Sequence, residues 1–212
     1  MLLLDAYVTP RSPKDLNDIL KAEKLFGYRA VGVDYSSLPS NISSEEISVF
    51  PVRAVSASTE AEAKEILHNI RKNDALNIAR ANGAGALRVF SRDSRIHIVE
   101  ISPKLAQYLD SNQAKLLKVG RSLLGFSLSS IQDDLRNVWW LSYLTKYSVK
   151  YSIGMVIYSG ARELSELAHP KIVLSMLVQT GLTREMALSI MDGSKLEWAL
   201  SKYSKHFGKE GK

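Results

Sequence analysis

Three acidic residues stand where parallel strands are expected to end, so their carboxylates could share one site. Asp5 belongs to the first β-rich run, Asp34 lies near the end of the second, and Glu100 lies late in the fifth. The active site of a parallel barrel is assembled at the carboxyl ends of its strands, which makes the three a candidate hydrolytic cluster. Single acids at strand ends more commonly cap helices or pair with arginine, and we prefer that interpretation.

The chain has four histidines and no cysteine, which disfavours a metal centre. A multinuclear site needs several histidines and carboxylates that converge on one barrel mouth, and no two histidines form an H-x-H or H-E-x-x-H pair. Without cysteine, thiolate zinc sites, iron–sulfur clusters and thiol catalysis are excluded. We therefore expect this chain to hold no metal and no cofactor. The histidines are His68, His97, His169 and His206.

A run of small residues at 82–86 (NGAGA) invites comparison with a phosphate-binding loop. Adjacent glycines can direct backbone N–H groups at an anion. The run matches neither the Walker pattern nor G-x-G-x-x-G. We interpret it as a small-residue turn between a strand and a helix.

Positive charge is clustered rather than spread evenly. The chain has 28 Lys+Arg, 22 Asp+Glu, a net charge of +6 and a pI near 9.4, a balance that favours polyanionic partners. Cations recur at 71–95, at 115–121 and around the last strand–helix connection, and the arginine fork can bond two phosphate oxygens at once. A solvated helix face explains any one group, but their recurrence on the connections between strands favours RNA binding. The candidate RNA-binding residues are Arg80, Arg88, Arg92, Arg95, Lys118, Arg121, Arg162 and Lys171.

Trp139 and Trp140 are adjacent in a predicted helix. Neighbouring helical positions are about 100° apart, so both rings cannot point into the core. A half-exposed ring would suit a protein partner. The alternative is that it covers the barrel flank beneath Tyr143 and Leu144.

The elements that must position these residues alternate along the chain. β-rich runs and amphipathic helical segments in succession are typical of parallel strands joined by helical crossovers. Seven such units predict an α/β fold, a seven-stranded (β/α) TIM-like barrel with extra C-terminal helices, although an open doubly wound sheet would share this linear pattern. We expect strands at 2–8, 29–35, 48–54, 75–81, 96–101, 122–128 and 152–159, and helices at 13–25, 60–70, 87–90, 131–147, 170–178, 183–191 and 196–203.

Two helix starts carry clear capping signals. Ser12 before a proline reads as an N-cap followed by proline at the first helical position. Thr59 with Glu62 has the spacing of a capping box. Both signals support the predicted order of strands and helices.

The length of 212 residues fits one compact core. We expect a single barrel domain over 1–204 and a basic, flexible tail over 205–212. The apolar run at residues 1–4 is too short for a secretory signal, and no stretch approaches the roughly 20 apolar residues of a membrane helix. We therefore expect a cytoplasmic protein without a membrane partner.

The last third of the chain contains a more specific pattern. It consists of YSIGMVIY at 151–158, SGARE at 159–163, Pro170, and a helix that ends at Gly181-Leu182 before Ala187. Upstream, IVEISP at 98–103 and LGFSL at 124–128 belong to the same pattern. These segments resemble the archaeal and eukaryotic ribonuclease P protein component 3 family, most strongly from 96 to 191. The chain departs from that family at Ile172, where an acid is usual, and at Ser129, where an arginine is common.

The resemblance implies a distorted, PHP-like seven-stranded barrel, related to metal-dependent phosphoesterases but lacking their metal-binding histidines. It implies a subunit of ribonuclease P, the endoribonuclease whose RNA removes the 5′ leader of precursor tRNA, with no active site on the isolated chain. The implied partners are the catalytic RNA, precursor tRNA, a small RRM-like subunit and other ribonuclease P proteins, with Mg²⁺ bound by the RNA. The cations of this chain would neutralise backbone phosphates and hold a compact RNA conformation.

Two other functions compete with this hypothesis. The first is a metal-dependent phosphoesterase or amidohydrolase-like barrel that uses Asp5, Asp34 and Glu100. The second is a barrel that binds only proteins.

Overall fold

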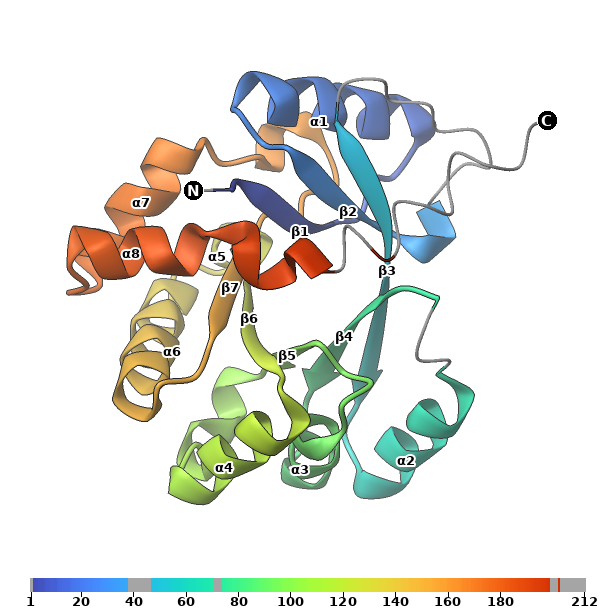
Figure 1. The fold of residues 1–212 in the computed structure, drawn as a ribbon, viewed down its shortest axis with the longest axis vertical. Helices are drawn as coiled ribbons and strands as arrows, with labels where there is room; N and C mark the ends of the chain where they lie inside the picture. The colour runs from blue at the N-terminus through green and yellow to red at the C-terminus, as the bar shows by residue number, and fades with distance from the viewer. Residues whose placement is uncertain (1, 38–46, 71–73, 199–201, 203–212) are drawn as a thin grey trace. The chain divides into compact units, whose positions relative to one another are not determined.

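The computed structural model describes residues 2–37, 47–70, 74–198 and 202. Its sheet has seven strands whose spatial order follows their order in the chain (Figure 1). The pairs β1–β2, β2–β3, β4–β5 and β5–β6 are parallel. The strands are Leu4–Val8 (β1), Ala30–Asp34 (β2), Ser48–Ala57 (β3), Leu76–Ala81 (β4), Ile98–Ile101 (β5), Leu123–Ser127 (β6) and Met155–Tyr158 (β7).

The chain that follows β7 returns to β1. The backbone N–H of Gly160 donates to the carbonyl oxygen of Tyr7 at 3.0 Å, and that of Thr9 donates to the carbonyl of Ala161 at 2.9 Å. An open doubly wound sheet reverses its strand order and leaves its edge strands unpaired. The sequential order and these bonds exclude that alternative, so the predicted α/β TIM-like fold is confirmed.

Helices alternate with the strands, as predicted. Ser12 caps the first helix through its hydroxyl, which accepts from the N–H of Asp15, and Thr59 and Glu62 form the expected capping box. The helices are Pro13–Leu25 (α1), Glu60–Asn69 (α2), Ala84–Arg92 (α3), Ser111–Gly120 (α4), Ser129–Asp133 (α5), Asn137–Tyr151 (α6), Pro170–Gln179 (α7) and Arg184–Met191 (α8). Short 3-10 helices are Tyr35–Ser37 (η1), Pro103–Tyr108 (η2), Leu164–Glu166 (η3) and Gly193–Leu196 (η4). None of the helices in these described segments is long and apolar enough to cross a membrane.

The predicted elements differ from the structure in several places. Helix α4 was missed, although Asp110 caps it by accepting from the N–H of Gln113 at 2.8 Å. The helix expected over 131–147 is two helices, α5 and α6, because Asp134 adopts an extended backbone conformation. Of the last predicted helix, residues 199–201 and 203 lie outside the described residues.

The chain divides into two compact units. Unit 1 comprises Met1–Val52, Ser127–Leu135 and Ile157–Lys212, and unit 2 comprises Arg53–Phe126 and Arg136–Val156. The single domain over 1–204 stays a prediction, and the expected tail over 205–212 lies outside the described residues. Each unit is described below by itself.

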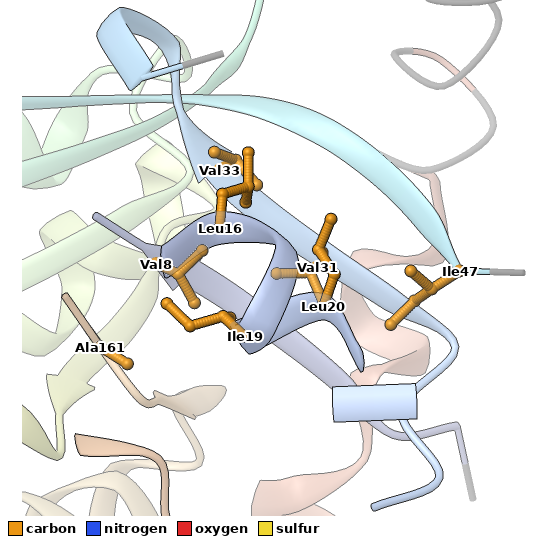
Figure 2. Close-up of a cluster of buried hydrophobic side chains, with 8 residues drawn as sticks. All are labelled: Val8, Leu16, Ile19, Leu20, Val31, Val33, Ile47 and Ala161. Carbon is orange, nitrogen blue, oxygen red and sulfur yellow. The ribbon is translucent and has the colours of Figure 1, made fainter. Parts of the chain in front are cut away.

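In unit 1 the apolar face of α1 packs on β1 and β2. Figure 2 shows the side chains of this helix turned toward those of the two strands. Burial of each such aliphatic side chain contributes about 1.5–3 kcal/mol. The fully packed cluster consists of Val8, Leu16, Ile19, Leu20, Val31, Val33, Ile47 and Ala161.

Unit 1 also buries two carboxyl groups against each other. Asp5 is 2% and Glu23 1% exposed. One oxygen of Asp5 accepts from the backbone N–H groups of Tyr7 at 3.2 Å and Ser159 at 3.0 Å. Burial, and then the negative charge of Asp5, raise the pKa of Glu23 to about 10. Glu23 therefore keeps its proton at neutral pH and donates it to Asp5.

In unit 2, α3 and α4 approach so closely that the contact requires glycine. A Cβ on Gly120 would stand 2.3 Å from the carbonyl oxygen of Ser91, which lies on α3. Beside this contact, the side-chain amide of Gln113 donates to the Ser91 hydroxyl at 2.6 Å, with both groups buried. The glycine and the polar bond fix the spacing of these helices.

Glu23→Gln should flatten the dependence of stability on pH. The pKa of Glu23 is 4.5 in the unfolded chain and is raised to about 10 in the folded chain. The native chain should therefore lose stability as the pH rises between these values, by at most about 1.4 kcal/mol per unit for one proton. The amide does not titrate and can still donate to Asp5. Urea unfolding at pH 5, 7 and 9 measures the difference.

The exposed Glu65→Gln on α2 is the matched control and should keep the native pH dependence. If stability depended on pH equally in Glu23→Gln and in the native chain, the inference that Glu23 keeps its proton in the folded state would be wrong.

Gly120→Ala should destabilise the chain by roughly 1–3 kcal/mol. Alanine favours a helix over glycine by about 1 kcal/mol, so destabilisation would show that the clash with Ser91 outweighs helix propensity. The exposed neighbour Val119→Ala should change stability by no more than about 0.5 kcal/mol. Urea unfolding compares the two variants, and an unchanged Gly120→Ala would mean that the helices do not need this approach.

Candidate nucleic-acid interface

Two neighbouring helices of unit 2 carry exposed cations. Arg88 and Arg92 lie one turn apart on α3, and Lys115 and Lys118 lie on α4, all four exposed. The helical period places them outward because Ala86, Leu87, Val89 and Phe90 of α3 are buried. We call Arg88, Arg92, Lys115 and Lys118 the α3–α4 surface.

The α3–α4 surface borders a hollow of about 510 Å³. Arg88, Arg92 and Lys115 line it together with a single acid, Asp110. The Asp110 carboxylate is already engaged as the N-cap of α4. The cations therefore dominate the charge of this hollow, which favours an anion such as a phosphate. The other lining residues are Tyr108, Asn112, Gln113 and Leu116.

Most cations of this surface have no partner among the described residues. In the part of the chain that the structure describes, the side chains of Arg88, Lys115 and Lys118 make no hydrogen bond or ion pair. Like charges gathered around one hollow repel each other, and a bound polyanion would relieve that repulsion. The arrangement suits the backbone of a nucleic acid.

Two of the predicted RNA-binding arginines are tied into the fold of unit 2. Arg80 donates through Nε to Glu100 at 2.7 Å, across the register of β4 and β5. Arg95 donates through Nε and Nη2 to Asp93, and through Nη1 to the carbonyl oxygen of Leu67. Both guanidinium groups therefore stabilise loops and strands, and their RNA contacts stay predictions.

The remaining predicted cations are not part of the α3–α4 surface. Arg121 ends α4 in a left-handed conformation and is exposed. Arg162 and Lys171 belong to unit 1. Arg162 pairs with Glu166 at 2.9 Å and with Asp133 at 3.2 Å, whereas Lys171 is exposed in the first turn of α7.

The three candidate catalytic carboxylates all have structural partners. Asp34 accepts from the Tyr7 hydroxyl at 2.7 Å, Glu100 pairs with Arg80, and Asp5 holds backbone N–H groups. No group of three or more His, Cys, Asp or Glu that could hold a metal ion exists among the described residues. The pairing of Glu100 with an arginine is the arrangement that we preferred from the sequence. The expectation that this chain binds no metal stays a prediction.

The small-residue run at 82–86 contains the start of α3. Gly83 is the N-cap, and a Cβ there would stand 1.9 Å from the carbonyl oxygen of Ser58. The glycine is explained by this close approach of two backbone segments. The interpretation as a strand-to-helix turn is confirmed, although the helix begins at Ala84 rather than at Leu87.

Neither a protein-family model nor a curated protein matches the sequence. Solved structures are similar to it in fold. One is a chain in the cryo-EM structure of archaeal ribonuclease P with mature tRNA, with a TM-score of 0.72 and 12% identity over 97% of this chain and 94% of that one. An uncharacterized protein has a TM-score of 0.58 and 12% identity, covering 95% of this chain and 74% of its own.

A metal-containing phosphatase has a similar fold as well. Histidinol phosphate phosphatase from Lactococcus lactis, in complex with zinc, L-histidinol and phosphate, has a TM-score of 0.53 and 9% identity, covering 85% of this chain and 95% of its own. At such identities a similarity shows the fold alone. The chain therefore shares its fold both with a protein of archaeal ribonuclease P and with a phosphatase barrel.

Proposed function

We propose that this chain is the barrel protein subunit of ribonuclease P, protein component 3, and acts as an RNA-binding scaffold for the catalytic RNA. The observation that carries the proposal is the similarity to a chain of archaeal ribonuclease P, which covers 97% of this chain and 94% of that one. The two chains thus correspond over nearly their whole lengths. The segments at 98–103, 124–128 and 151–163 that resemble the component 3 family support the same assignment.

The α3–α4 surface supplies the physical mechanism. Each lysine or arginine that neutralises a phosphate releases condensed counterions, which drives binding without regard to base sequence. Arg88 and Arg92 can add directional, bidentate hydrogen bonds to phosphate oxygens. Because α3 and α4 are held together by Gly120 and Gln113, these cations are presented on a rigid support.

The proposed chain lends shape and charge to an RNA that performs the reaction. It would act in the cytoplasm with the catalytic RNA, precursor tRNA, a small RRM-like subunit and other ribonuclease P proteins. Mg²⁺ would accompany the RNA rather than this chain. Removal of the 5′ leader is then the activity of the whole particle.

Replacement of Arg88, Arg92 and Lys115 by alanine should weaken binding to the catalytic RNA and make it less salt-dependent. Each lost phosphate contact lowers the slope of log affinity against log salt by about 0.7–0.9. The triple variant should therefore lose roughly 2–3 in slope if all three residues touch phosphates. Binding measured between 50 and 200 mM salt, with precursor-tRNA cleavage by the reconstituted particle, tests this.

A charge-matched control comes from unit 1. Lys14, Lys21 and Arg29 are exposed, and their replacement by alanine removes the same charge. This variant should keep most of the native slope. Equal losses in both variants would reduce the effect to net charge, and no loss in either would favour a barrel that binds only proteins.

The fold similarity to a zinc-containing phosphatase keeps a second candidate function, metal-dependent phosphoester hydrolysis that uses Asp34. The scaffold proposal expects the purified chain to hold no stoichiometric divalent metal and to leave p-nitrophenyl phosphate intact. Metal analysis and a hydrolysis assay on the native chain and on Asp34→Asn test it. If the native chain held stoichiometric metal and hydrolysed the phosphoester, and Asp34→Asn lost that activity, the scaffold proposal would be wrong and the chain would be an enzyme.

A further inference from the structure

Helix α6 holds three aromatic rings in a nearly parallel stack. The Trp139, Trp140 and Tyr143 ring centroids lie 5.3–6.1 Å apart, with interplanar angles of 11–24°. Trp140 is 3% exposed, whereas Trp139 is 58% exposed. The expectation that the two tryptophans could not both be buried is confirmed, and it is Trp139 that lies toward solvent.

Hydrogen bonds fix Trp140 and Tyr143, the two rings beside Trp139. The indole N–H of Trp140 donates to the carbonyl oxygen of Ile101 at 2.9 Å, and the hydroxyl of Tyr143 donates to the carbonyl of Ala106 at 3.2 Å. A flat partner placed on Trp139 would therefore meet rings whose orientation is already set. Binding to such a preorganised surface loses little conformational entropy.

The exposed part of this stack is too small for a stable protein interface by itself. Tyr143 is 36% exposed, and an aromatic side chain offers about 150–250 Å² in all, so the exposed ring area is roughly 200 Å². A standard protein interface buries about 800 Å² on each partner. A single nucleic-acid base is a planar ligand of the right size for one indole ring.

The charge around the stack favours the same ligand. Helix α6 contains no acidic residue, and the exposed Lys146 lies about one turn beyond Tyr143. Lys104, also exposed, lies on the η2 turn that Tyr143 contacts through Ala106. The aromatic ring and the surrounding cations form the combination that binds single-stranded nucleic acid.

The stack adjoins the hollow beside the α3–α4 surface through one segment. Tyr143 bonds to Ala106, two residues before Tyr108, which lines the hollow. The Tyr147 hydroxyl donates to the carbonyl oxygen of Asp110, another lining residue, at 2.8 Å. α6 and the hollow thus share the backbone of residues 106–110, all within unit 2.

We propose that Trp139, supported by Tyr143, is a stacking platform for an unpaired RNA base, adjacent to the hollow that takes phosphates of the same strand. The inference rests on the proposed RNA-binding function and adds to it a preference for single-stranded RNA at this place. It assigns Trp139 a role that the phosphate contacts of the α3–α4 surface do not supply.

Tryptophan emission of the full chain tests the platform directly. A base stacked on Trp139 should quench the emission when a 12-nucleotide single strand is added, and a duplex of equal length should quench it far less. Trp139→Leu keeps apolar bulk but removes the ring, and should weaken single-strand binding by about 5- to 100-fold. Its salt slope should remain native, because no phosphate contact is removed.

Two variants serve as matched controls. Trp139→Phe keeps an aromatic face and should bind within a few-fold of the native chain while losing the quenching signal. Trp198→Phe removes a partly exposed tryptophan of unit 1 and should keep the quenching. Because Trp139 points outward, both Trp139 variants should unfold at the native urea concentration.

The outcomes separate this inference from the proposed function. If the Arg88, Arg92 and Lys115 variant binds RNA weakly but Trp139→Leu binds single strands normally, the platform is overturned and the scaffold stands. If neither variant changes RNA binding, both proposals fail. If Trp139→Leu weakens only binding to the small RRM-like subunit and leaves RNA binding unchanged, the Trp139 ring belongs to a protein interface and the platform is likewise overturned.

Discussion

The close approach of α3 and α4 is the constraint on which the proposed interface depends. Only a residue without a side chain allows the end of α4 to lie against the carbonyl oxygen of Ser91, and the Gln113 amide satisfies the buried hydroxyl beside it. Because the apolar faces of both helices are turned inward, Arg88 and Lys115 face solvent and line the same hollow. The same packing that stabilises unit 2 therefore concentrates positive charge on its surface.

The surrounding arginines show that positive charge alone does not define an RNA site. Three of the predicted arginines form ion pairs with a carboxylate of their own unit: Arg80, Arg95 and Arg162. A guanidinium group in such an ion pair would have to leave its carboxylate before it could bind a phosphate. The lost ion pair would reduce the free energy gained from the phosphate contact. Arg88 and Lys115 carry no such penalty within the described residues, so they are the stronger phosphate ligands.

The sequence could predict the order of elements because their signals are local. Ser12, Thr59 and Glu62 cap their helices through residues three positions away, and the alternation of strands and helices needs no long-range information. α4 was missed because its apolar face is narrow, although the spacing of Asp110 and Gln113 is a capping signal that could have found it.

The site depends on tertiary register, which no local pattern contains. The Arg80–Glu100 pair follows from the alignment of β4 with β5, and the hollow joins Arg88 to Lys115 across two helices. Trp139 was partly foreseen, since two adjacent helical rings cannot share one face, and Arg88, Arg92 and Lys118 were among the predicted cations. The sequence therefore predicted cations in the right segments but could not separate those that stabilise the fold from those that face solvent.

The Asp5 and Asp34 carboxylates of unit 1 are engaged in internal hydrogen bonds, which disfavours a catalytic role for them. Tyr7 donates to Asp34, and its ring meets that of Tyr158 edge-on at 5.9 Å. The nearby Asp5 holds two backbone N–H groups. A substrate phosphate or a metal ion that used Asp34 would compete with an internal hydrogen bond, and a phosphate at Asp5 would add negative charge beside a buried carboxyl group whose pKa burial already raises. A polyanion on the α3–α4 surface displaces only water and counterions, which is why we place the proposed RNA contacts of this barrel on its helices and assign no reaction to its strand ends.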